Sequence, residues 1–193
     1  MTAPSLAAVF RPAATRAAWT YDLTLIALGS LLIAAAAWIQ IRLPFTPVPI
    51  TAQTFAVVLL GALYGSRRGA ATVLAYLAQG ALGLPVFAGG AAGLAYILGP
   101  TGGYLLGFIL AAAVAGFLAE RGWDRRPATT ALAMTLATAA LFIPGLLWLG
   151  LFIGYHAVLP AGLIPFLPGA IIKIALATAA LPIGWKVLNH LRS

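Results

Sequence analysis

Cysteine is absent from this 193-residue sequence, and charged residues make up only 7% of it. The absence of cysteine excludes disulfides, thiolate metal sites and cysteine nucleophiles. The scarcity of charge, together with 63% hydrophobic residues and a mean hydropathy of +1.04, is far from the balance of a soluble domain. The chain is therefore expected to lie in a lipid bilayer.

Uncharged stretches of sequence predict the number of helices. They cover 23–41, 43–66, 69–119 and 127–172, and a further apolar stretch follows Lys173. A transmembrane helix needs about 20 apolar residues, so the third and fourth stretches must each hold two helices. We predict an all-α fold. A single membrane domain is expected to cover 1–193 and to begin with a cytoplasmic segment at 1–20. Its six transmembrane helices are expected at 21–41, 51–65, 69–83, 101–120, 128–152 and 165–187.

Basic residues predict the orientation of these helices. The net charge is +8, and arginine or lysine residues precede the first predicted helix, follow the last, and occupy the loops after the second and fourth. Only Arg42 falls on the other side. The positive-inside rule therefore puts both termini in the cytoplasm. Because the basic residues form no continuous face, we expect no nucleic acid as a partner.

The three loops predicted outside the cell differ from ordinary solvated loops. They span 42–50, 84–100 and 153–164, are nearly uncharged, and carry proline, glycine and aromatic residues. Non-helical backbone with few charges near membrane depth usually lines a cavity or is buried by protein. We expect these outer loops to form a lid.

The sequence offers little for catalysis. His156 and His190 are its only histidines and are predicted on opposite sides of the membrane, so neither a histidine metal cluster nor a nucleophile–histidine–acid arrangement can be assembled. No G-x-x-x-x-G-K-[ST] phosphate loop is present. We therefore expect no enzyme activity, no metal and no cofactor, and any energy from ATP would have to come from another subunit.

Small residues predict how the helices pack. "GALYG" (61–65), "GYLLG" (103–107) and "GLFIG" (150–154) repeat the G-x-x-x-G spacing. Such spacing lets two helices approach closely in a membrane, where no hydrophobic force drives them together. We interpret these motifs as internal packing surfaces.

Lys173 is the most unusual residue of the predicted helices. It lies eight residues beyond Pro165, roughly 12 Å along a helix, and a lysine at the centre of a membrane helix costs about 2.5–3.5 kcal/mol. Asp22, Glu120 and Asp124 are the only acidic residues, and all three are predicted at the cytoplasmic side. A ligand with an acidic or strongly accepting group would complement this lysine. The alternative is a lysine that snorkels to the interface.

Other polar side chains are expected at a similar depth: Gln53, Tyr76, Gln79 and Tyr155. Each has another explanation, because a glutamine can cap a helix or bond to a neighbouring helix, and a tyrosine can belong to an aromatic belt. Together with Lys173 they predict a small-molecule pocket, which needs apolar walls and a few fixed polar groups. Candidates for the walls are Phe45, Phe87, Tyr96, Trp148 and Phe166.

Several ordered motifs resemble those of one family: "PVPITAQTF" (47–55), "GALYGSRRGA" (61–70), "YLAQGALGLPVFAGG" (76–90), "LGPTGGYLLGF" (98–108) and "IPFLPGAIIK" (164–173). The chain resembles the BioY family, the biotin-binding substrate components of energy-coupling-factor (ECF) transporters. The resemblance implies six helices with an outward-facing biotin pocket. It also implies that the protein lies among the lipids of the cell (inner) membrane of a prokaryote. It also implies a complex with a transmembrane coupling protein and two cytoplasmic ATPase subunits.

The resemblance assigns roles to single residues in the pocket. Lys173 matches the lysine that contacts biotin in the family, and either the carboxylate or the ureido carbonyl of biotin could accept its hydrogen bond. Ala170 stands where some relatives carry an acid, so either Gln53, Gln79 or a backbone carbonyl replaces that acid or the affinity for biotin is lower.

Two further roles follow from the resemblance. Because no arginine lies between Arg68 and Arg121, the backbone N–H groups of Gly89 and Gly90 are candidates to bind the biotin tail instead. Small residues on the first helix dock on the coupling protein in the family, and Ser30 and Ala34 have the corresponding spacing.

Two other functions remain open at this point. The chain could be a self-sufficient secondary carrier for biotin or a similar small anionic vitamin, although it lacks the buried acid that ion-coupled carriers commonly use. It could also be a structural membrane protein in which Lys173 only snorkels. The expected function is high-affinity biotin binding and uptake, powered by partner ATPases.

Overall fold

The uncharged stretches of the sequence form long helices in the computed structural model, which describes residues 3–192. The longest helices of that range are α2 (Thr15–Trp38), α3 (Gln53–Tyr64), α4 (Ser66–Ala81), α6 (Gly102–Ala119), α7 (Pro127–Ile153) and α9 (Leu167–Arg192). Each overlaps one of the six predicted helices. The shorter helical segments are α1 (Leu6–Val9), η1 (Ala88–Gly90), α5 (Leu94–Ile97), η2 (Trp123–Arg125), α8 (Val158–Gly162) and η3 (Ile164–Phe166).

The helices differ in whether they are long enough to cross a membrane. Within the described range, four segments are long and apolar enough: α2, α6, α7 and Val158–Leu191, most of which is α9. Helix α3 is apolar but has only 12 residues, about 18 Å against a hydrocarbon core of about 30 Å. Six full spans were expected, so α3 and α4 fall short of that expectation by this measure.

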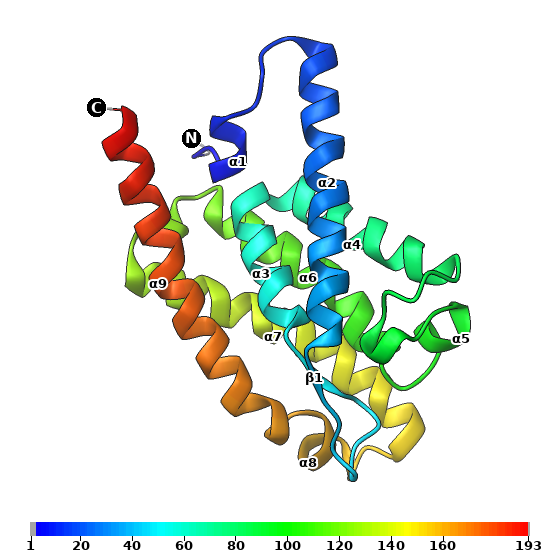
Figure 1. Ribbon diagram of the computed structural model, residues 1–193. Helices are drawn as coiled ribbons and strands as arrows, with labels where there is room; N and C mark the ends of the chain where they lie inside the picture. The colour runs from blue at the N-terminus through cyan, green and yellow to red at the C-terminus, as the bar shows by residue number, and fades with distance from the viewer. Residues whose placement is uncertain (1–2, 193) are drawn as a thin grey trace.

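Helix α6 lies at the centre of the arrangement (Figure 1). It contacts α3, α4 and α7, and most of its residues are buried. Helix α2 packs on α3 and α4, while α9 packs on α7 and touches α3. Helices α2 and α9 therefore form the outer flanks, with large apolar side chains on their exposed faces.

Glycines allow the close contacts of α6 with its neighbours. A methyl group on Gly61 of α3 would lie 2.5 Å from the backbone oxygen of Ala112, and one on Gly107 would lie 2.5 Å from the backbone oxygen of Leu141 in α7. A methyl carbon does not approach backbone atoms this closely, so only glycine permits these helix contacts. The prediction of internal packing is confirmed for "GALYG" and "GYLLG". In "GLFIG", Gly150 instead lies against the ring of Tyr155.

A short β-hairpin joins α2 to α3, which the all-α prediction missed. Strand β1 (Gln40–Ile41) pairs antiparallel with β2 (Ile50–Thr51), with Gln40 opposite Thr51. Two-residue strands give no periodic pattern that a sequence analysis can detect. The first long helix also begins earlier than the predicted start at residue 21. Helix α2 begins at Thr15, inside the cytoplasmic segment that was expected at 1–20.

The two ends of the molecule carry different charges. Figure 1 shows both termini at one end and the hairpin at the other. The three acidic residues lie toward the end with the termini, and each has a partner: Asp22 bonds Arg11 and Arg68, Glu120 accepts from the Ser66 N–H, and Asp124 accepts from Trp185 Nε1. The hairpin end contains Arg42 and no acidic residue.

Candidate ligand-binding site

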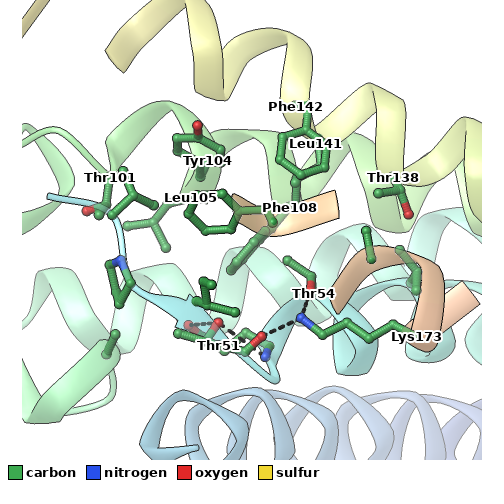
Figure 2. A pocket seen from close by; sticks show the side chains of 18 of the residues that line it. Thr51, Thr54, Thr101, Tyr104, Leu105, Phe108, Thr138, Leu141, Phe142 and Lys173 are labelled. Carbon is green, nitrogen blue, oxygen red and sulfur yellow. Dashed lines mark hydrogen bonds between the residues drawn. The ribbon is translucent and has the colours of Figure 1, made fainter. Parts of the chain in front are cut away.

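A pocket lies between α3, α6, α7 and α9, closed at one side by the hairpin (Figure 2). We call it the central pocket. Its walls are mainly apolar and aromatic, with Leu105, Leu141, Tyr96, Tyr104, Phe108, Phe142 and Phe166. Its polar side chains are Thr51, Gln53, Thr54, Thr101, Thr138 and Lys173. This combination of apolar walls and a few polar groups is typical of small-molecule sites.

Lys173 extends from α9 across the pocket toward the start of α3. Its Nζ donates hydrogen bonds to the backbone oxygen of Thr51 at 2.6 Å and to the Oγ1 of Thr54 at 2.7 Å, as Figure 2 shows. An ammonium group has three donors, so one N–H remains for a ligand. The side chain is half-buried and bonded to protein atoms, which differs from a lysine that snorkels to water.

Gln53 also lines the central pocket, and a hydrogen bond to a residue outside the pocket holds its side-chain amide in place. Its Nε2 donates to the hydroxyl of Tyr76 at 2.6 Å, and both side chains are buried. The edge of the Tyr76 ring meets Phe87 at 5.6 Å, and Phe87 stacks on Tyr96 at 5.0 Å. Tyr76 and Phe87 were predicted to bind the ligand directly. In the structure they lie behind Gln53 and Tyr96, and they support these two residues.

Gln79 and Tyr155 lie away from the central pocket. The Nε2 of Gln79 donates to the Oγ of Ser30 at 2.9 Å, which joins α4 to α2. The Tyr155 ring is exposed, and its hydroxyl donates back to the Leu147 oxygen at 3.2 Å. Neither is among the residues that line the pocket. The Oε1 of Gln79 is buried without a hydrogen-bond partner in the described structure, but it lies outside the pocket, so the structure brings neither side chain to the central pocket.

The predicted glycines lie beside the hairpin. The N–H of Gly90 donates to the Phe87 oxygen at 3.0 Å, so it is already occupied and does not point to a ligand tail as expected. Gly89 has φ +71° and lies against the side chains of Arg42 and Gln40.

Ser30 and Ala34 were expected to dock on a coupling protein. Both are buried within the chain, at 0% and 8% exposure, because this face of α2 packs on its neighbours. The Ser30 hydroxyl is occupied as well, since it donates to the Ala27 oxygen and accepts from Gln79. The structure therefore corrects this expectation: these two side chains are not available to a partner.

Of the five aromatic wall candidates, Tyr96 and Phe166 line the pocket. Phe45 is exposed, and Trp148 donates its indole N–H to the Gly99 oxygen at 2.9 Å.

Sequence reasoning missed Tyr104, Phe108, Phe142 and the threonines of the pocket. The ring of Tyr104 stacks on Phe166 at 6.1 Å and meets Phe142 edge-on at 6.2 Å. Its hydroxyl donates to the Gly162 oxygen at 2.8 Å, which connects α6 to the α8 segment. Tyr104 lies inside "GYLLG". The glycines of this motif indicate helix packing, so the tyrosine between them was not recognised as a pocket residue. For Thr54, the only signal was its place in "PVPITAQTF".

Comparison with known proteins adds independent information. The model of the BioY family matches residues 8–190. A protein of Pyrococcus horikoshii named "Probable biotin transporter BioY" is 39% identical over 72% of this chain and 81% of its own length. The "Biotin transporter BioY" of Rhizobium etli is 38% identical over 88% of this chain and 97% of its own length.

One solved structure is similar in fold. It is the crystal structure of the S-component for biotin from an ECF-type ABC transporter. It is 27% identical, with a TM-score of 0.77, over 90% of this chain and 95% of the other.

Proposed function

The chain belongs to the BioY family, and from this premise we propose that it binds biotin in the central pocket and takes part in biotin uptake across a membrane. The observation that carries the proposal is Lys173, an ammonium with a free donor among aromatic walls. Biotin has an apolar bicyclic ring, an accepting ureido carbonyl and a carboxylate. The pocket offers surfaces for the ring and a cation for an accepting end.

The ureido N–H groups of biotin need acceptors in this pocket. Ala170 lines the pocket where some relatives carry an acid, and it has no polar group. Gln53, Thr54 and Thr138 line the same pocket and contain oxygens that accept hydrogen bonds. Gln53 is the best placed of these, because Tyr76 holds its amide. Gln79 is bonded to Ser30 and does not take this role.

The chain acts, in this proposal, as the substrate-specific component of an ECF-type transporter. A transmembrane coupling protein and two cytoplasmic ATPases would supply the energy, and the chain itself would not be an enzyme. Six helices would lie in the cell (inner) membrane of a prokaryote with both termini in the cytoplasm, α3 and α4 being short. The pocket would then open outward, under the loops that contain α5 and α8.

Two hydrogen bonds support a lid at the mouth of the pocket. Tyr104 bonds the Gly162 oxygen in α8, and Trp148 bonds the Gly99 oxygen after α5. Each joins a long helix to one of the loops expected to cover the ligand. Release of these bonds would let the loops open while the helices stay in place.

The test is a pair of measurements on the purified chain. Titration calorimetry with biotin, and with lipoate and thiamine as other vitamins, should show tight binding of biotin alone. Uptake into liposomes should require the ECF module and ATP. A chain that binds no biotin would overturn the proposal. Uptake driven by a proton or sodium gradient without ATPases would instead support a secondary carrier.

A further inference from the structure

A second cavity lies beside the central pocket, between the β1–β2 connection and the loop that precedes α5. We call it the hairpin cavity. Its polar side chains are Gln40, Arg42 and Thr46. It shares three lining residues with the central pocket: Pro49, Ala88 and Tyr96. The two cavities therefore adjoin at these three residues, and Arg42 lines the hairpin cavity on its side of them.

Arg42 forms no ion pair with any residue in the described range 3–192. The chain has three acidic residues, and all three are bonded toward the other end of the molecule. The two ion pairs of residues 3–192 both involve Asp22. The hairpin cavity thus contains an exposed cation that has no ion-pair partner among the described residues.

The loop backbone is shaped to admit the guanidinium. Gly89 has φ +71°, where side chains are rarely tolerated. A methyl group there would clash with Arg42 Nη2 and would lie 2.8 Å from Gln40 Nε2. The arginine side chain therefore occupies the space that any other residue at position 89 would fill.

We propose that Arg42 binds the carboxylate of the ligand in the hairpin cavity, while Lys173 donates to an uncharged acceptor in the central pocket. This inference rests on the proposed function, and it assigns the two ends of biotin. A guanidinium presents parallel N–H donors that match a carboxylate. Lys173 has already committed two of its three donors to Thr51 and Thr54, so it suits a single carbonyl oxygen better than a carboxylate.

The experiment compares two ligands that differ only in charge at the tail. Biotin and biotinamide are titrated by calorimetry into wild type and into Arg42→Gln, Arg42→Lys and Lys173→Met. Arg121→Gln is the matched control, because this arginine stacks on Phe117 at the far end of α6. Size-exclusion chromatography establishes that each variant is folded.

Arg42→Gln should weaken biotin binding at least tenfold and leave biotinamide binding unchanged. Arg42→Lys keeps the charge and loses the paired donors, so its affinity for biotin should lie between those of wild type and Arg42→Gln. Lys173→Met should weaken both ligands by the same factor, and Arg121→Gln should alter neither. The inference is overturned if Arg42→Gln affects both ligands equally or not at all. If wild type binds neither ligand, the proposed function fails first.

Discussion

Replacing Lys173 with methionine removes the only charged side chain among the described residues that line the central pocket, and it keeps an unbranched side chain of similar length. The ammonium donates to the Thr51 oxygen and to Thr54 Oγ1, and it has one donor left for biotin. The substitution therefore removes one bond to the ligand and two bonds that hold the start of α3 against α9.

The expected loss of affinity follows from the bond to the ligand. A hydrogen bond to a charged group contributes about 1.5–3 kcal/mol net, and each 1.4 kcal/mol is about tenfold in Kd. Lys173→Met should therefore raise the Kd for biotin by roughly ten to a hundredfold. The loss of the bonds to Thr51 and Thr54 should also lower the thermal stability of the unliganded chain, which a separate melting experiment measures.

Titration calorimetry on the detergent-purified chain measures the Kd, and Lys186→Met is the matched control. Lys186 lies on the same helix, is exposed, and does not line the central pocket. Its substitution should leave the Kd within a factor of two. If the Kd of Lys173→Met for biotin is within a factor of two of the wild-type Kd, the reasoning is refuted. Lys173 would then have a structural role only.

Three further predictions test other parts of the molecule. Ala170→Phe should abolish biotin binding by filling the pocket, whereas Ile171→Phe, at an exposed position, should preserve it in the same titration. Tyr104→Phe should speed biotin release in stopped-flow fluorescence, because it removes the hydrogen bond of about 1 kcal/mol to the α8 segment. An unchanged release rate would show that this hydrogen bond does not hold the lid closed. Burial raises the pKa of the Asp124 carboxyl above its ordinary 3.8, and the Trp185 N–H opposes this shift without cancelling it. Stability contributed by the protonated form is therefore lost as pH rises from 3.8 through the raised pKa, and a melting series should show this loss in wild type and not in Asp124→Asn.

The sequence predicted the positions of the long helices because uncharged runs in a membrane protein have few alternatives to helix. It also located Lys173 and Gln53 correctly in space, since both line the central pocket. Their binding roles stay predictions. A polar residue in an apolar helix must have a partner, and this requirement is visible without coordinates.

The sequence could not say which polar residues are partners of one another. Gln79 and Ser30 lie 49 positions apart and bond across α4 and α2, yet each alone resembled a functional residue. Gln53 and Tyr76 likewise form a pair, of which only Gln53 lines the pocket. Such pairing depends on which helix faces adjoin, and a single sequence contains no direct record of that.

The distribution of charge connects the fold to the proposed function. At the end with the termini, each acidic side chain is bonded to an arginine, a tryptophan or a backbone N–H. At the hairpin end, Lys173 and Arg42 face adjoining cavities in a region without acidic residues. Arg42 is exposed and Lys173 is half-buried, and two cations in adjoining cavities repel each other across the solvent between them. An anionic ligand that spans the two cavities would offset this repulsion, so the same imbalance that destabilises the empty site would strengthen binding. This predicts that added salt, which screens the repulsion, stabilises the empty chain more than the biotin-bound chain.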